Sequence, residues 1–122
     1  MRPALFAPLL LAAAMLTAAD SKDPLAGYVA GKPVRCIDYH FSDGPSIIDE
    51  HTILYRESGR RIWKTGPVDR CPSLRPLNTL VVEIRGGQLC DTDRFRVIAP
   101  GDIIPGPYCR FDKFTPYTKP AK

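Results

Sequence analysis

Several features that assign proteins to common functional classes are absent from this sequence of 122 residues. No two cysteines are spaced C-x-x-C, which argues against a thioredoxin-type redox site and against a zinc knuckle. The only adjacent basic pair is Arg60-Arg61, whereas a nucleic-acid surface normally shows a basic stripe or cluster. Thirteen scattered prolines leave no room for a long helix. We therefore expect a β-rich chain that does not bind nucleic acid.

Long apolar runs are absent after residue 19, and the first nineteen residues read as a signal peptide. Arg2 supplies the positive n-region, the run Ala4–Leu16 is mostly apolar, and Thr17 and Ala19 are small residues placed for cleavage after Ala19. The run is shorter than the roughly 20 apolar residues that span a bilayer. We predict a periplasmic or secreted protein with no permanent membrane span after cleavage, with an uncleaved N-terminal anchor as the alternative.

The mature chain is long enough for one domain. Cleavage leaves about 100 residues, which is a typical size for a single domain and too few for two. The net charge falls from +4 to +3 because Arg2 is lost. We expect residues 20–33 to be a leader, residues 34–117 to be a β domain, and residues 118–122 to be a tail. The final stretch "TPYTKPAK" shows no pattern.

Four cysteines, an even number, are present in a chain bound for an oxidising compartment. Two disulfides are the default for such a chain. Three connectivities are open, and the spacing does not choose among them. In the chain-entropy view each bridge contributes about 3–4 kcal/mol. The residues are Cys36, Cys71, Cys90 and Cys109.

Two hairpins stand out among short β segments separated by turn residues. In the first, Thr52–Glu57 and Arg60–Thr65 flank Ser58-Gly59, a two-residue turn that would set Tyr55 opposite Ile62. A three-residue loop would shift this pairing by one, so the register stays open. The second hairpin is "TLVVEIRGGQLC", with its turn in the glycine pair and with the leucine before its cysteine meeting the isoleucine before "RGG".

The remaining segments continue in the same manner. Phe95 and Val97 alternate with arginines, turns are expected at residues 100–102 and 105–107, and a last strand is expected over 108–114. We predict an all-β, small, single-domain antiparallel meander, barrel-like or sandwich-like, with two disulfides.

The stretch "CIDYHFSDG" carries the residue types of a cysteine-nucleophile site. On an extended strand, however, Cys36 and His40 would stand about 13 Å apart. A nucleophile and its base must approach to about 3 Å. No catalytic triad is therefore expected from Cys36, Asp38 and His40.

Asp38 and His40 are weak candidates for a metal site, because neighbours on one face of a strand can reach a common ion. A third ligand would have to come from His51, Asp91 or Asp93, and nothing in the sequence brings these close. We prefer the interpretation that both side chains face solvent while the apolar residues of "CIDYHF" pack inward. No cofactor and no catalytic residue is predicted.

Two further acidic groups and the aromatic residues have structural interpretations. Asp91 or Asp93 is expected to hold a turn by accepting backbone N–H groups, and the pair Asp49-Glu50 is expected in a turn between two β segments. Five aromatic residues are expected in the core rather than in a binding groove. They are Tyr39, Tyr55, Trp63, Phe111 and Phe114.

Several short motifs taken together resemble an uncharacterised family of small exported proteobacterial proteins, filed as a domain of unknown function. The motifs are "CIDYH", "SIIDEHTILYRESGRRIWK", "CPSL", "GGQLCDTDRFRVI" and "GPYCRFDKFTPY". They cover roughly residues 34–117. The resemblance implies export and a compact cysteine-linked domain, with no assigned activity or ligand. Because some relatives have the first and third cysteines without the other two, it also implies the pairs Cys36–Cys90 and Cys71–Cys109.

Three classes of function follow. The first is a non-enzymatic exported β domain that binds an unknown envelope protein or ligand. The second is an inhibitor of a periplasmic hydrolase of the lysozyme-inhibitor type, although a charge of +3 argues against a cationic lysozyme as its target. The third is a small metal-dependent enzyme built on Asp38, His40 and the acidic pair. We predict the first.

Overall fold

The structure is a computed structural model that describes residues 3–4, 23–41 and 43–121. The predicted signal peptide, apart from residues 3–4, lies outside the described residues. The rest forms short strands and one 3₁₀ turn. In chain order these are β1 (Val29–Ala30), β2 (Cys36–Ile37), η1 (Tyr39–Phe41), β3 (Pro45–Asp49), β4 (Thr52–Ser58), β5 (Arg61–Thr65), β6 (Thr79–Glu83), β7 (Leu89–Cys90), β8 (Arg94–Ile98), β9 (Cys109–Arg110) and β10 (Thr115–Thr118).

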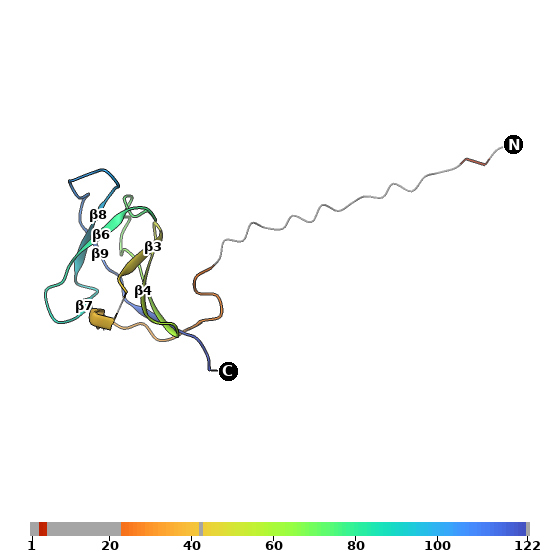
Figure 1. Ribbon diagram of the computed structural model, residues 1–122, viewed down its shortest axis with the longest axis horizontal. Coiled ribbons are helices and arrows are strands. Elements are labelled where there is room, and N and C mark those ends of the chain that lie inside the picture. Colours follow the sequence, from red (N-terminus) through yellow and green to blue (C-terminus); the bar gives the residue numbers. More distant parts are fainter. Residues whose placement is uncertain (1–2, 5–22, 42, 122) are drawn as a thin grey trace.

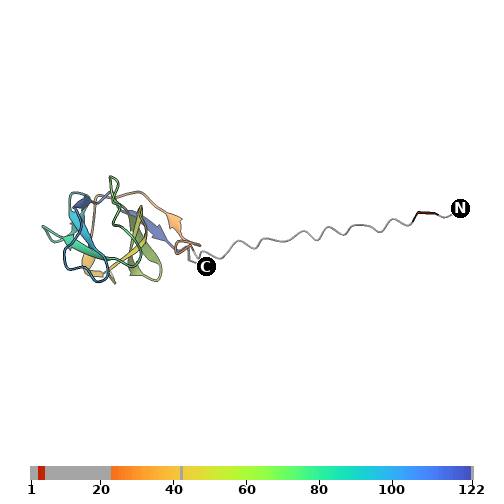
Figure 2. The same ribbon diagram turned by 90° about the horizontal axis from the view of Figure 1, so that it is seen from above.

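The strands form three antiparallel sheets. One has five strands in the order β1-β10-β5-β4-β3, one has three in the order β6-β8-β9, and β2 pairs with β7. Figure 1 places β3 and β4 on one side of the domain and β6, β8 and β9 on the other, and Figure 2 shows the sheets curving around a common interior. The predicted all-β antiparallel domain is confirmed. Its consecutive meander is β3-β4-β5, whereas β10 reaches β5 from the far end of the chain.

The core lies between the sheets and is largely aromatic. Phe95, Phe111 and Phe114 are fully buried, and the ring centroids of Phe95 and Phe111 are 4.6 Å apart. Of the other predicted core aromatics, Tyr55 is buried, while Tyr39 and Trp63 are partly buried and pack against the core. The interpretation of these aromatic residues as core is confirmed.

Two disulfides tie the sheets and the connecting segments together. Cys36–Cys90 joins β2 to β7, with Cα atoms 4.0 Å apart. Cys71–Cys109 joins the coil after β5 to β9, with Cα atoms 6.1 Å apart. This is the pairing that the family resemblance implied, and no cysteine is left free.

The first predicted hairpin is present as β4 and β5, in the shifted register. Tyr55 lies opposite Trp63 and Arg56 lies opposite Ile62, with a bulge between Arg56 and Ser58. With a two-residue turn, Arg56 would have lain directly opposite Arg61. The bulge replaces that like-charge pair with an arginine opposite an isoleucine, which is the less costly arrangement.

The second predicted hairpin is wrong. β6 pairs with β8 instead, so that Glu83 lies opposite Arg94 and Val82 lies opposite Phe95. The Cys36–Cys90 disulfide holds Leu89 against Ile37 in a separate pair of strands. The pairing of β6 with β8 joins opposite charges and matches two apolar side chains, which stabilises it over a local hairpin.

The two ends of the domain were also predicted incompletely. β1 lies in the expected leader and pairs with β10, in the stretch that showed no pattern. In the expected last strand over 108–114, only Cys109–Arg110 is a strand, while Phe111 and Phe114 form single bridges. Tyr28 fastens the leader by donating its hydroxyl to the carbonyl of Gly59 at 2.6 Å.

Candidate functional site

The "CIDYH" segment is not one extended strand. It is extended only at Cys36–Ile37, and η1 then turns the chain. The backbone N–H of His40 donates to Asp38 Oδ1 at 3.0 Å, so the carboxylate holds this turn. Asp38 and His40 are exposed, Ile37 is buried and Tyr39 is half-buried, as expected; the side chain of residue 41 lies outside the described residues. Across the described part of the chain, no three His, Cys, Asp or Glu residues are grouped to hold a metal ion.

Two of the other predicted acidic residues, Asp93 and Asp49, serve turns, as expected. Asp93 is buried and accepts a hydrogen bond from the backbone N–H of Cys90 at 2.8 Å. Asp49 accepts one from the backbone N–H of His51 at 2.8 Å, in the turn between β3 and β4. Asp91 forms an ion pair with Arg35 at 3.4 Å. Asp93 and Asp49 are therefore engaged in local turns, whereas Asp91 joins two distant segments.

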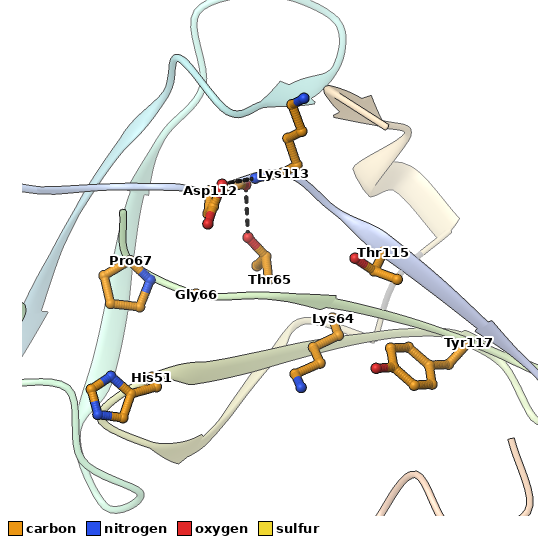
Figure 3. A pocket seen from close by; sticks show the side chains of 9 residues that line it. All are labelled: His51, Lys64, Thr65, Gly66, Pro67, Asp112, Lys113, Thr115 and Tyr117. Carbon is orange, nitrogen blue, oxygen red and sulfur yellow. Dashed lines mark hydrogen bonds between the residues drawn. The ribbon is translucent and has the colours of Figure 1, made fainter. Parts of the chain in front are cut away.

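A polar pocket of about 220 Å³ lies where β5 meets the C-terminal segment. Figure 3 shows its side chains, with Lys113 directed away from His51 and Lys64. The buried hydroxyl of Thr65 donates to the carbonyl of Asp112 at 2.9 Å, and the backbone N–H of Lys113 donates to the Asp112 carboxylate at 2.7 Å. The polar groups of this pocket therefore join two chain segments, and they do not converge on a ligand position.

The outer face of the β6-β8-β9 sheet has a different character. Phe95 and Val97 of β8 point into the core, so Arg94 and Arg96 point outward. The register sets Arg94 between Glu83 on β6 and the arginine of β9. The predicted alternation along this strand is thus confirmed, and it gathers guanidinium groups on one surface.

Two of these guanidinium groups contact the ring of Tyr108. The Cζ atoms of Arg94 and Arg96 are 4.1 Å and 4.7 Å from the centre of its ring, within the range of cation–π attraction. The Tyr108 hydroxyl donates to Glu83 Oε1 at 2.9 Å, and Arg94 donates to Glu83 Oε2 at 3.1 Å. The hydrogen bond from Tyr108 is the largest cause that holds the pKa of Glu83 below its usual range, and the hydrogen bond and charge of Arg94 lower it further. The four side chains therefore form one connected cluster.

Arg96 connects this cluster to residues 99–107 in the segment between β8 and β9, which we call the Ile103–Ile104 loop. Its guanidinium donates to the carbonyls of Gly106 at 2.8 Å and Pro105 at 3.1 Å. The N–H of Gly106 also donates to the carbonyl of Val97 at 2.8 Å. The C-terminal side of the loop is thereby fixed to β8.

A tight turn fixes the other side of the loop. The N–H of Asp102 donates to the carbonyl of Ala99 at 3.0 Å, and Gly101 has a φ of 84°. A proline followed by a glycine with positive φ is typical of a type II turn, so Pro100 and Gly101 suit this position. The predicted turn at residues 100–102 is therefore present, whereas residues 105–107 form no turn and are held to β8 by the hydrogen bonds of Arg96 and Gly106.

Between these two fixed sides the loop presents apolar side chains to solvent. Ile103 is 91% exposed and Ile104 is 75% exposed. Two adjacent, nearly bare isoleucines on a tied loop stand out in a domain that buries most of its other long apolar residues, although Leu77 is also highly exposed, and such adjacent exposure marks interaction sites. The sequence predicted the turns but gave no sign that these two residues would lie outside the core.

The structure describes no helix that is long and apolar enough to cross a membrane. Comparison with known proteins adds no relatives to this picture. No family model, no curated protein and no solved structure matches the chain.

Proposed function

We propose that the protein is an exported, non-enzymatic binding module that holds a protein partner through the Ile103–Ile104 loop. The observation that carries the proposal is the exposure of Ile103 and Ile104 on a loop whose two sides are fixed by hydrogen bonds. The two disulfides are compatible with an oxidising compartment, where export would place the protein.

The loop can supply useful binding energy. Burying an isoleucine side chain contributes about 1.5–3 kcal/mol, so the pair offers about 3–6 kcal/mol. Because Arg96 and the Ala99–Asp102 turn already hold the loop, little conformational entropy is lost when a partner closes over it. A loop of this kind is an anchor for a complementary apolar pocket.

Inhibition of an envelope hydrolase is a second form of the same activity. It is favoured by the Cys71–Cys109 disulfide, which fastens the chain two residues after the loop ends. A fixed, protruding apolar loop is suited to filling a substrate cleft. The hypothesis of a metal-dependent enzyme gains no such support, because Asp38 accepts a hydrogen bond from its own backbone turn.

The test is site-specific photo-crosslinking in the exported protein. A crosslinking amino acid at position 104 is expected to capture one envelope protein, which is then purified and its affinity for the wild-type chain measured. Replacing both isoleucines, Ile103→Ser with Ile104→Ser, should weaken that affinity by more than about tenfold, since 1.4 kcal/mol is a factor of ten.

Leu77→Ser is the matched control, because Leu77 is 85% exposed and lies outside the loop. It should leave the affinity unchanged. Equal affinity of the double variant and the wild type would refute the proposal. A partner that hydrolyses an envelope polymer and is inhibited on binding would identify the second form.

A further inference from the structure

The outer face beside the loop carries more positive charge than its own contacts balance. Arg94 and Arg110 lie directly opposite one another in the β8–β9 pair. Like charges at such positions are destabilising. Glu83 offsets Arg94 from the other side, at 3.1 Å. Among the described residues, neither Arg110 nor its neighbour across the pocket, Arg70, has an ion-pair partner within 4 Å.

These groups surround a pocket of about 270 Å³. Its lining combines three guanidinium groups with one carboxylate, that of Asp69, and with the Tyr108 ring. With one carboxylate against three guanidinium groups, the pocket has an excess of positive charge that an incoming anion would offset.

The pocket is also organised before a ligand arrives. Glu83 holds one end of the Arg94 guanidinium, and Tyr108 supports its face. A planar guanidinium held in this way loses little freedom when it binds a carboxylate or phosphate group. Arg96 stacks on the same ring and holds the Ile103–Ile104 loop, so the pocket and the loop form one continuous surface.

We infer that this pocket receives an aspartate or glutamate side chain of the protein partner, next to the apolar pocket that receives Ile103 and Ile104. The inference rests on the proposed function and defines its partner as a protein whose binding surface is apolar with an acidic border. Asp102 directly precedes Ile103 at the tip of the loop and is exposed. An anionic membrane would repel this carboxylate at the depth where the isoleucines insert, which favours a protein over a lipid surface.

The pocket can be tested apart from the loop by an NMR titration of the disulfide-bonded protein with an acetylated tetraglutamate amide. Backbone resonances of residues 69–70, 94 and 108–110 are expected to shift in a saturable manner. Arg110→Gln and Arg70→Gln should each weaken binding by about fivefold to tenfold, as expected for the loss of one charge-assisted contact. Raising the salt concentration should weaken it further.

Arg60→Gln is the control, because it removes the same charge from the exposed β4–β5 turn on the other sheet. An equal effect of Arg60→Gln would show that only net charge matters and would overturn the assignment, as would shifts that do not centre on the pocket. Inorganic phosphate that binds as tightly as the peptide would overturn the carboxylate assignment. Tighter association with phosphatidylglycerol vesicles than with the peptide would assign the surface to a membrane instead.

The isoleucine double variant separates this inference from the proposed function. It should bind tetraglutamate as the wild type does, because neither isoleucine lines the pocket. If the double variant keeps its affinity for the crosslinked partner, the proposed function fails while the pocket stands. If tetraglutamate does not bind, the pocket fails while the loop stands.

Discussion

The substitution Tyr55→Phe tests how the core accommodates a polar atom. The Tyr55 side chain is 3% exposed, and its hydroxyl has no hydrogen-bond partner in the described part of the structure. Its ring meets Phe114 edge to face, with centroids 6.4 Å apart, and a phenylalanine ring preserves that contact. The variant therefore removes one unpaired buried oxygen and little else.

The expected change is an increase in the free energy of unfolding. A buried polar group without a partner costs about 1–3 kcal/mol, and part of this is offset by the contacts that the oxygen makes. We expect Tyr55→Phe to be more stable by about 1 kcal/mol. For a domain of this size that corresponds to a melting temperature higher by about 4–8 °C.

The pH dependence gives a second measure of the same group. Burial raises the pKa of Tyr55 above its value of about 10 in an unfolded chain. The wild type therefore keeps the full contribution of this residue below pH 10 and loses it as the pH rises further, because the unfolded state ionises first. The stability difference between Tyr55→Phe and the wild type should grow above pH 10.

Urea unfolding from pH 7 to pH 11, with disulfides intact, measures both effects. Tyr28→Phe is the control, since the Tyr28 hydroxyl has a partner in Gly59, and this variant should be equally or less stable than the wild type. If Tyr55→Phe proves less stable by more than about 1 kcal/mol, the hydroxyl has a partner and the reasoning is refuted.

Three further predictions address the cluster, the pocket junction and the disulfides. In a carbon-13 NMR titration the pKa of the Glu83 carboxyl should lie below its usual value, and Tyr108→Phe should raise it. The contribution of Glu83 to stability is therefore present above the usual pKa and is lost as the pH falls through the lower folded-state pKa. Gly66→Ala should cost about 1–3 kcal/mol in a thermal melt, because a Cβ there collides with the His51 carbonyl oxygen, and an unchanged melting temperature would contradict this. Replacing both members of the Cys71–Cys109 pair with serine should cost about 4 kcal/mol in denaturant unfolding, whereas thiol titration of the folded wild type should find no reactive thiol.

Local patterns in the sequence predicted the parts of the fold that local contacts decide. The β4–β5 hairpin follows from two β-rich runs around a turn, and the burial of Phe95 and Val97 follows from alternation along one strand. The sequence leaves the hairpin register open, because a three-residue loop would shift the pairing by one residue. The unfavourable facing of two arginines, which the bulge avoids, decided between the two registers.

Local sequence patterns did not predict which strands pair when the strands are far apart in the chain. The failed hairpin over residues 79–90 had a plausible glycine turn, but its second half is held elsewhere by the Cys36–Cys90 disulfide. β10 had no visible signal because Pro116 interrupts its alternation, and it is held by β5 on one side and β1 on the other. The contacts that specify β10 therefore come from segments far from it in the sequence.

The candidate site was missed for a related physical reason. In "IAPGDIIPGPYC" the adjacent isoleucines resemble any other pair of core residues, and hydropathy alone would bury them. The turn at Ala99–Asp102 and the hydrogen bonds from Arg96 to the carbonyls of residues 105 and 106 leave the pair at the tip of the loop, where both side chains are exposed. In the sequence, Arg96 alternates with core residues as a solvent-exposed charge does, but its guanidinium donates hydrogen bonds to the loop. The exposure of the isoleucines therefore depends on the fold of the whole loop. Substituting Arg96 should impair partner binding although it removes no apolar side chain.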